Sequence, residues 1–174
     1  MDTRNELPKY FKSLGFKVGA EIGVYRGWFT KRLLDAGLKV YGIDPWGHYE
    51  GHSKRQQHYD EAKKTLKQYI DSGQCELIRK ASMDAIKDFV DGSLDFVYID
   101  ADHRFKYIAE DLYHWTWKVR KGGIVSGHDY NYNGVEDVNQ TGPVVDAYVK
   151  SFKINGLRII GEKDKASSWL WIKE

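Results

Sequence analysis

Residues 18–27 read Val18-Gly19-Ala20-Glu21-Ile22-Gly23-Val24-Tyr25-Arg26-Gly27, a short apolar run followed by a turn that contains glycines. The apolar run predicts a buried strand, and the pattern that begins at Trp28 predicts a helix directly after the turn. Gly23 permits a tight turn with a close backbone approach, and Gly27 lets the helix pack near the strand. This stretch therefore predicts the first strand–turn–helix unit of an α/β fold.

The rest of the chain repeats this alternation. Further strands are predicted at residues 39–44, 76–79, 94–99 and 123–126. Helices are predicted at residues 28–34, 59–70, 105–119 and 144–152. Ser82 is expected to cap a helix after the third strand. Alternation of this kind implies a parallel sheet with helices on both faces. The last two strands, at 157–160 and 169–172, have no predicted helix between them and indicate an antiparallel hairpin.

Length and composition narrow the class of protein. With 174 residues, the chain is expected to form a single domain over residues 1–174. Its formal net charge of +2 does not indicate the strongly basic surface that is typical of nucleic-acid-binding proteins. No apolar run is long enough to span a membrane. The N-terminal residues lack the apolar stretch of a signal peptide, and Cys75 is the single cysteine. These features predict a cytoplasmic protein.

Residues at the ends of the strands predict a nucleoside site. Ligands of open α/β sheets bind beyond the carboxyl ends of the strands. Asp44 follows Gly23 by 21 residues, where a carboxylate can bind both ribose hydroxyls. Tyr25 stands where a dinucleotide motif needs a glycine for the pyrophosphate, and Glu21 would repel phosphates and favour a cation. The charge of S-adenosylmethionine, which carries a sulfonium and an ammonium group, suits this site better than that of NAD.

The ordered set of motifs resembles the class I S-adenosylmethionine-dependent methyltransferases. It consists of Glu21-x-Gly23-x-x-x-Gly27, Tyr41-Gly42-Ile43-Asp44, Phe96-Val97-Tyr98-Ile99-Asp100 and Gly122-Gly123-Ile124-Val125-Ser126-Gly127-His128-Asp129. Within that class, the chain is similar to the macrocin-type sugar and catechol-type O-methyltransferases. The resemblance covers roughly residues 14–172 and implies a Rossmann-like, doubly wound, mostly parallel seven-stranded sheet with an antiparallel C-terminal strand.

The resemblance also implies roles for individual residues. Glu21, Gly23 and Gly27 would hold the methionine part of the cofactor, and Asp44 would bind its ribose. Ser82 would lie by the adenine with Met83 as an apolar neighbour, and Asp100 would border the same pocket. Trp46 is a candidate stacking partner on our own inference, apart from the family pattern.

Two interpretations of how a substrate hydroxyl is activated at the ends of the fourth and fifth strands stay open. In the first, Asp100, His128 and Asp129 bind a divalent metal that lowers the pKa of a substrate hydroxyl. Related magnesium enzymes usually carry a carboxylate or amide where His128 stands. In the second, His103 or His128 is a general base beside Asp100, since an imidazole accepts a proton near neutral pH. His103 stands about where the catechol-type enzymes carry a catalytic lysine.

The leading hypothesis is an O-methyltransferase that acts on a small hydroxylated molecule, such as a sugar or glycan precursor. The polar loop Tyr130–Thr141 would close over that substrate, and the many aromatic residues suit a homodimer interface. The alternatives are a non-catalytic nucleoside-binding module, which would not need the acidic and histidine groups, and a nicotinamide-dependent oxidoreductase, which Tyr25 disfavours.

Overall fold

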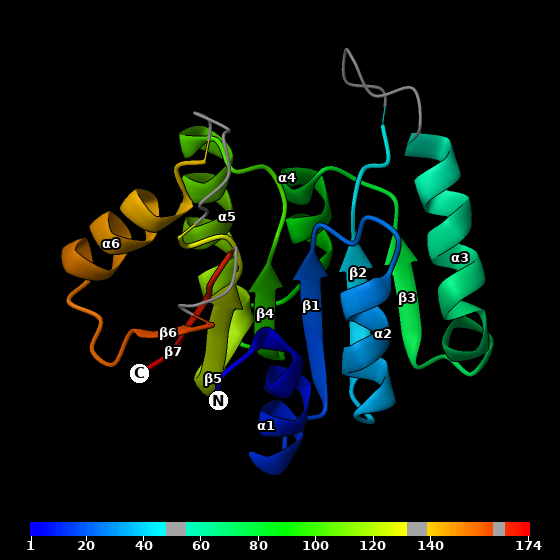
Figure 1. The fold of residues 1–174 in the computed structure, drawn as a ribbon, viewed down its shortest axis with the longest axis horizontal. Coiled ribbons are helices and arrows are strands. Elements are labelled where there is room, and N and C mark those ends of the chain that lie inside the picture. Colours follow the sequence, from blue (N-terminus) through cyan, green and yellow to red (C-terminus); the bar gives the residue numbers. More distant parts are fainter. Residues whose placement is uncertain (48–54, 132–138, 162–165) are drawn as a thin grey trace.

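A computed structural model describes residues 1–47, 55–131, 139–161 and 166–174 of the chain (Figure 1). In this described part, one seven-stranded sheet has the strand order β3-β2-β1-β4-β5-β7-β6. Its strands are β1 (Val18–Ile22), β2 (Lys39–Ile43), β3 (Cys75–Ile78), β4 (Leu94–Ile99), β5 (Val119–Gly127), β6 (Arg158–Ile160) and β7 (Ser168–Ile172). All neighbours pair in parallel except β5 with β7 and β6 with β7. The predicted fold class is therefore confirmed, including the C-terminal hairpin.

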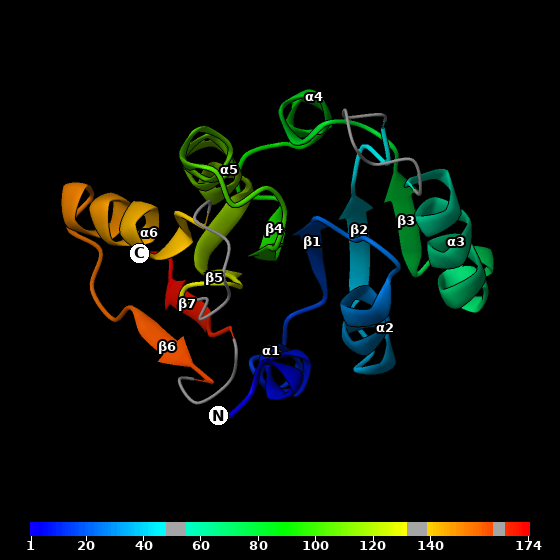
Figure 2. The same cartoon turned by 45° about the horizontal axis from the view of Figure 1, so that its top comes forward.

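Helices cover both faces of the sheet (Figure 2). The α-helices are α1 (Leu7–Ser13), α2 (Trp28–Asp35), α3 (Arg55–Asp71), α4 (Ser82–Ala85), α5 (Phe105–Lys118) and α6 (Thr141–Ser151), and the short 3-10 helices are η1 (Arg4–Glu6) and η2 (Ile86–Asp88). Side chains of α1, α2 and α3 form one core cluster with the sheet, whereas α5 and α6 contribute to a second. The apolar stripe of each helix explains this division, because each helix packs its apolar side against one of the two faces of the sheet.

The boundary between α5 and β5 differs from the prediction. The sequence predicts a helix as far as Val119, a stop at the glycine pair, and a strand from Gly123, but α5 ends at Lys118 and β5 begins at Val119. Val119 is buried and pairs with Leu94, and the register shifts between Leu94 and Phe96. A β-bulge of this kind accommodates extra residues in one strand. Residues 119–122, which the sequence predicts as the end of the helix and the turn after it, are therefore part of β5.

The chain reverses its direction of winding between β1 and β4. From β1 it builds β2 and β3 on one side, and then it crosses to place β4 on the other. Gly23 follows β1 and Asp100 follows β4, and a Cβ on Gly23 would lie 2.0 Å from the Asp100 carbonyl oxygen. Gly23 also has φ +92°, a conformation that residues with a side chain rarely adopt. The glycine thus sets how closely the two strand ends meet at the point where ligands of such sheets bind.

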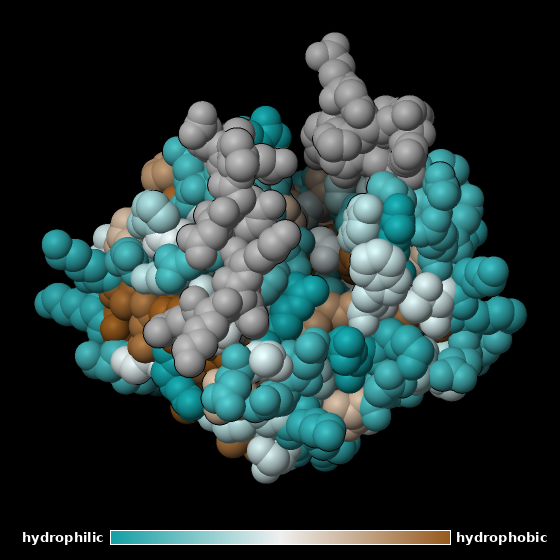
Figure 3. Space-filling model, in the orientation of Figure 1, coloured by the Kyte–Doolittle hydropathy of each residue, from teal (hydrophilic) through white to brown (hydrophobic). Residues whose placement is uncertain are grey.

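Figure 3 shows hydrophilic residues over most of the face that carries α1, α2 and α3. Large apolar side chains nevertheless remain exposed, among them Trp28 of α2, Trp117 of α5 and Phe152 after α6. They are the aromatic surface on which the homodimer prediction depends, and that association stays a prediction. Within the described ranges, no helix combines the length and apolar character needed to cross a bilayer.

Candidate functional site

A cavity of about 600 Å³ opens beyond the carboxyl ends of β1, β2 and β4. Small-molecule sites in proteins typically fall between about 300 and 1,000 Å³. The predicted residues that line the cavity are Glu21, Gly23, Asp44, Ser82, Met83, Asp100 and His103. The sheet therefore gathers side chains from distant parts of the sequence around one ligand-sized space.

Glu21 is a buried acid at the β1 end of the cavity. It is 2% exposed, and its Oε2 atom has no hydrogen-bond partner among the described residues. Burial is the main reason that the pKa of Glu21 rises to about 8, because removing a carboxylate from water disfavours its charged form. A buried acid that lines a cavity and has an oxygen without a partner is suited to a ligand that donates a hydrogen bond or carries a positive charge.

Replacing Glu21 with glutamine is expected to flatten the pH dependence of stability. The pKa is about 8 in the folded protein and near 4.5 ordinarily, so the folded state binds more protons between these values. The free energy of unfolding therefore falls as the pH rises through this window. At about 1.4 kcal/mol per pKa unit, the wild-type protein loses up to about 4 kcal/mol more than Glu21→Gln between about pH 5 and about pH 8. Urea unfolding of both proteins at each pH measures this difference.

Glu76→Gln, which removes an exposed carboxylate from β3, is the control for that experiment. Its pH dependence is expected to match that of the wild-type protein. If Glu21→Gln also follows the wild-type curve, Glu21 does not hold a proton in the folded state.

Asp44, which directly follows β2, stabilises the turn after β1 by hydrogen bonds. Its Oδ2 atom accepts hydrogen bonds from the backbone nitrogens of Val24 at 3.2 Å and Tyr25 at 3.0 Å. Its Oδ1 atom accepts one from the backbone nitrogen of Trp46 at 2.8 Å. Because each carboxylate oxygen has two acceptor positions, the side chain retains capacity for a ligand hydroxyl on the cavity side. The carboxylate thus shapes the turn as well as lining the cavity.

Ser82 does not cap a helix, in contrast to the prediction. It is the first residue of α4, and Ala81 precedes it as the cap residue. The Ser82 hydroxyl accepts a hydrogen bond from Trp115 Nε1 at 2.7 Å and donates one to the Asp111 carboxylate. Asp111 is 4% exposed and lines the cavity, and burial raises its pKa to about 7. This chain of bonds from Trp115 through Ser82 holds the Asp111 side chain at the Ser82 end of the cavity.

Two other residues predicted for the cofactor end, Gly27 and Trp46, have packing roles in the described structure. Gly27 does not appear among the described residues that line the cavity, and a Cβ placed on it would lie 2.9 Å from the Leu66 side chain. Gly27 thus allows close packing of α2 against α3, and its contact with the cofactor stays a prediction. Trp46 is also absent from the described lining, since its ring is buried beside Val24 and Ala62 and its indole nitrogen donates to the Tyr25 carbonyl. Trp46 therefore belongs to the core and does not stack on a ligand.

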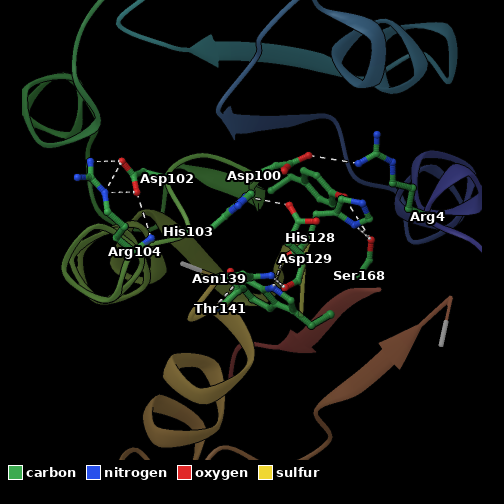
Figure 4. Close-up of polar contacts among 12 residues, drawn as sticks. Arg4, Asp100, Asp102, His103, Arg104, His128, Asp129, Asn139, Thr141 and Ser168 are labelled. Carbon is green, nitrogen blue, oxygen red and sulfur yellow. Dashed lines mark hydrogen bonds and ion pairs between the residues drawn. The ribbon is translucent and has the colours of Figure 1, made fainter. Parts of the chain in front are cut away.

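A cluster of two acids and one imidazole lies at the β4–β5 edge of the cavity. Ligand atoms of Asp100, His103 and Asp129 all lie within 4.8 Å of one another. His103 Nε2 is 2.8 Å from Asp129 Oδ2, and Figure 4 shows the imidazole directed toward that carboxylate. Asp129 has φ +56°, an uncommon conformation for a residue with a side chain. The backbone is thus held so that Asp129 faces His103.

The position of His103 is fixed by the start of α6. The backbone nitrogen of Gln140 donates to the His103 carbonyl at 2.9 Å, and Gln140 Oε1 accepts from the Phe105 backbone nitrogen at 2.7 Å. Asn139 Nδ2 donates to the Asp129 carbonyl at 2.8 Å. The far end of the predicted substrate loop therefore anchors both partners of the His103–Asp129 pair. Residues 132–138 of that loop lie outside the described residues.

His128 takes a different place from the one predicted. Its Nδ1 atom is 2.9 Å from Ser168 Oγ of β7, and it does not join Asp100 and Asp129 in the described three-residue cluster (Figure 4). Neither His128 nor Asp129 is among the described residues that line the cavity, whereas His103 lines it. The imidazole that accompanies the two predicted carboxylates is therefore His103. The predicted ligand set of Asp100, His128 and Asp129 differs from this cluster in its imidazole, and metal binding stays a prediction.

The cluster carries shifted pKa values that follow from burial and pairing. Contact with Asp129 is the main reason that the pKa of His103 rises above its ordinary 6.5. Burial alone would raise the pKa of Asp129, but His103 and the charge of His128 outweigh it, so the net pKa is lowered. Burial, followed by repulsion from Asp129, raises the pKa of Asp100. Asp129 and His103 thus form an ion pair beside a third group that readily accepts or releases a proton.

Arg4 and Asp111 line the cavity and were missed by the sequence analysis. Arg4 lies in η1 and contacts Asp100, which is 96 residues away in the sequence. Asp111 lies in the middle of α5, and in the sequence it cannot be distinguished from a polar residue on the solvent-exposed face of that helix. Neither position carries a local motif.

Comparisons with known proteins place the chain in a family. A family model described as a methyltransferase domain matches residues 20–130, well over half of the chain. A search of curated proteins finds no significant match. Among solved structures, the chain is similar to an O-methyltransferase from Bacillus cereus in complex with SAH, with a TM-score of 0.70, 14% identity, and coverage of 98% of this chain and 80% of that one.

Two further structures show the same likeness. One is a putative caffeoyl-CoA O-methyltransferase from Staphylococcus aureus, with a TM-score of 0.72, 17% identity, and coverage of 97% of this chain and 81% of that one. The other is a putative rRNA-methylase from Clostridium thermocellum, with a TM-score of 0.69, 14% identity, and coverage of 100% and 98%. At sequence identities this low, the structural similarity shows that this chain shares the fold of these proteins. Together with the matching family model, it confirms the resemblance to class I S-adenosylmethionine-dependent methyltransferases, and the chain belongs to the methyltransferase domain family.

Proposed function

We propose that this protein transfers the methyl group of S-adenosylmethionine to a hydroxyl oxygen of a small molecule. The observation that carries the proposal is the position of His103, which lines the cavity and lies 2.8 Å from the Asp129 carboxylate. Methylation of oxygen requires removal of a hydroxyl proton, so a paired imidazole at the cavity edge is the group that such a reaction needs. The O-methyltransferases among the similar structures agree with this acceptor atom.

The cavity has a feature to match each part of the cofactor. The unpartnered Oε2 atom of Glu21 suits the ammonium group, and Asp44 suits the ribose hydroxyls. Asp111, held in place by Ser82, suits the amino group of adenine. When bound, S-adenosylmethionine supplies a methyl group that passes to the acceptor oxygen as its bond to sulfur breaks, with the electron pair left on sulfur.

His103 would take the proton from the acceptor hydroxyl. If the Nε2 hydrogen points at Asp129, the neutral ring has its lone pair on Nδ1, which is then free to accept a proton. Asp129 would orient the ring and stabilise its positive charge after the transfer. The same pairing raises the pKa of His103, which makes it a stronger base but requires a higher pH to keep it neutral.

A divalent metal is the alternative means of activating the hydroxyl. The carboxylates of Asp100 and Asp129 and the imidazole of His103 offer a donor set within 4.8 Å that suits manganese, iron or zinc. A bound cation would lower the pKa of the acceptor hydroxyl and hold it in place. In the described structure, however, the contact between Arg4 and Asp100 and that between His103 and Asp129 already supply positive charge to these carboxylates. We therefore favour His103 as the base.

The acceptor that we propose is a small hydroxylated molecule, with sugars and glycan precursors as the first candidates. The near-neutral net charge does not favour a nucleic-acid acceptor, although one similar structure is a putative rRNA-methylase. The described residues on either side of 132–138 are polar and include Tyr130, Asn139 and Gln140. Polar groups around the opening are suited to a hydroxylated substrate.

Methyl transfer to a panel of acceptors tests this proposal. The protein is incubated with S-adenosylmethionine that carries a labelled methyl group, together with sugars, nucleotide sugars and catechols. We expect a labelled methyl ether, identified by nuclear magnetic resonance, at the same rate before and after treatment with a chelator. Transfer to nitrogen or carbon alone would contradict the proposed acceptor atom. Activity that a chelator removes and manganese restores would favour the metal over His103 as the activating group.

A further inference from the structure

Arg4 brings a positive charge to the acidic end of the cavity. It lies in η1, and its Nη1 atom is 3.2 Å from Asp100 Oδ2 (Figure 4). Its guanidinium lies 5.3 Å from the centre of the Phe29 ring, which lines the same cavity. The side chain is about one-third exposed, so it is held in place and still accessible from the cavity. A guanidinium has five N–H donors, and the contacts with Asp100 and the Tyr98 hydroxyl use only part of them.

The other positively charged side chains among the described cavity residues are paired with carboxylates other than Glu21 and Asp100. Arg26 Nε is 2.9 Å from Glu61 Oε2 of α3, and its guanidinium lies over the rings of Tyr25 and Trp28. His103 Nε2 is 2.8 Å from Asp129. Among these cations, Arg4 is therefore the one whose direct carboxylate partner is Asp100, beside Glu21 at the ends of β4 and β1.

This combination of charges matches an α-amino acid. The methionine end of the proposed cofactor carries an ammonium and a carboxylate on the same carbon. Glu21 and Asp100 offer carboxyl oxygens to the ammonium, but an ionised Asp100 would repel the carboxylate if no cation stood beside it. A planar guanidinium binds a carboxylate through two parallel hydrogen bonds. We propose that Arg4 binds the carboxylate of the cofactor and thereby selects a nucleoside that carries a complete amino acid.

The inference rests on the proposed function, because it assumes that the cavity binds S-adenosylmethionine. Arg4 would act as a positioning residue. By holding the carboxylate, it would fix the methionine end between β1 and β4, and so the distance of the methyl group from His103. A different role, as a counter-ion that only neutralises Asp100, would not distinguish ligands with and without a carboxylate.

The test compares two ligands that differ only in that group, S-adenosylmethionine and decarboxylated S-adenosylmethionine. Isothermal titration calorimetry measures the affinity of each for the wild-type protein, Arg4→Ala and Arg4→Gln. We expect the wild-type protein to bind S-adenosylmethionine about 10- to 100-fold more tightly than the decarboxylated ligand. Arg4→Ala should lose this preference while its affinity for the decarboxylated ligand stays within about threefold of the wild type.

Arg32→Ala removes an exposed guanidinium from α2 and is the matched control for charge and side-chain size. It should retain the full preference. Arg4→Gln keeps a long polar side chain in case Arg4→Ala does not fold, and it should lose the preference as well. Equal losses for both ligands in the Arg4 variants would overturn the inference and leave the proposed function standing. A wild-type protein that binds neither ligand would overturn both.

Discussion

Replacing His103 with alanine is expected to lower kcat for methyl transfer by about 10²- to 10⁴-fold, the usual contribution of a positioned general base. Binding of S-adenosylhomocysteine should change by less than about threefold, because the carboxylate that His103 contacts belongs to Asp129, which is not among the described residues that line the cavity. Initial rates at saturating S-adenosylmethionine measure the first quantity, and calorimetry measures the second. His114→Ala, which removes an exposed imidazole from α5, is the control.

The pH profile shows whether His103 acts as the base. Only the neutral imidazole accepts a proton, and its pKa lies above 6.5, so kcat should rise with pH through a midpoint above that value. Asp129→Asn removes the carboxylate that raises the pKa, so the midpoint should move to lower pH while the plateau falls. A His103→Ala variant with wild-type kcat would contradict this assignment. A midpoint that does not move in Asp129→Asn would contradict the role of the pair.

Replacing Asp44 with alanine is expected to weaken binding of S-adenosylhomocysteine by about 10²- to 10⁴-fold. Hydrogen bonds to a charged group contribute about 1.5–3 kcal/mol each, and the ribose offers two hydroxyls. The variant also loses the bonds to the backbone nitrogens of Val24 and Tyr25, so the turn after β1 loosens. Calorimetry on the variant and on Asp60→Ala, which removes an exposed carboxylate from α3, separates this loss from a general effect of charge.

The ligand provides a second control, because Asp44 serves both the turn and the cavity. If Asp44 binds the ribose, the wild-type protein should bind adenosine at least about tenfold more tightly than 2′,3′-dideoxyadenosine. Asp44→Ala should bind both weakly and without preference. Equal affinity of the wild-type protein for the two nucleosides would mean that Asp44 supports the turn alone.

The sequence predicts the parts of this structure that depend on local patterns. Continuous apolar runs such as Leu94–Ile99 are typical of strands buried on both faces, and their order along the chain predicts the sheet. Gly23 and Asp44 could be found because a strand end followed by a tight turn places them at the carboxyl edge of the sheet. The same rule placed Asp100 and Asp129 together, since β4 and β5 are neighbours.

Contacts that depend on the packing of distant segments could not be predicted in this way. His128 and Asp129 are adjacent in the sequence, yet His128 contacts Ser168 whereas Asp129 contacts His103. The partner of His128 belongs to the C-terminal hairpin, whose register only the folded sheet defines. Arg4 reaches Asp100 from a 3-10 helix that has no apolar period. Gly27 has the spacing of a ligand-binding glycine, but the neighbour that requires it is Leu66 of α3.

Titration of the wild-type protein with S-adenosylhomocysteine and with NAD⁺ tests most directly whether the cavity takes the amino acid end of a nucleoside. The acids Glu21 and Asp100 border the cavity, and the side chain of Tyr25 lines it close to the turn after β1. We predict saturable binding of one S-adenosylhomocysteine per chain and no measurable heat with NAD⁺. Tighter binding of NAD⁺, or displacement of S-adenosylhomocysteine by inorganic pyrophosphate, would show that the cavity is built for a diphosphate and would contradict the account.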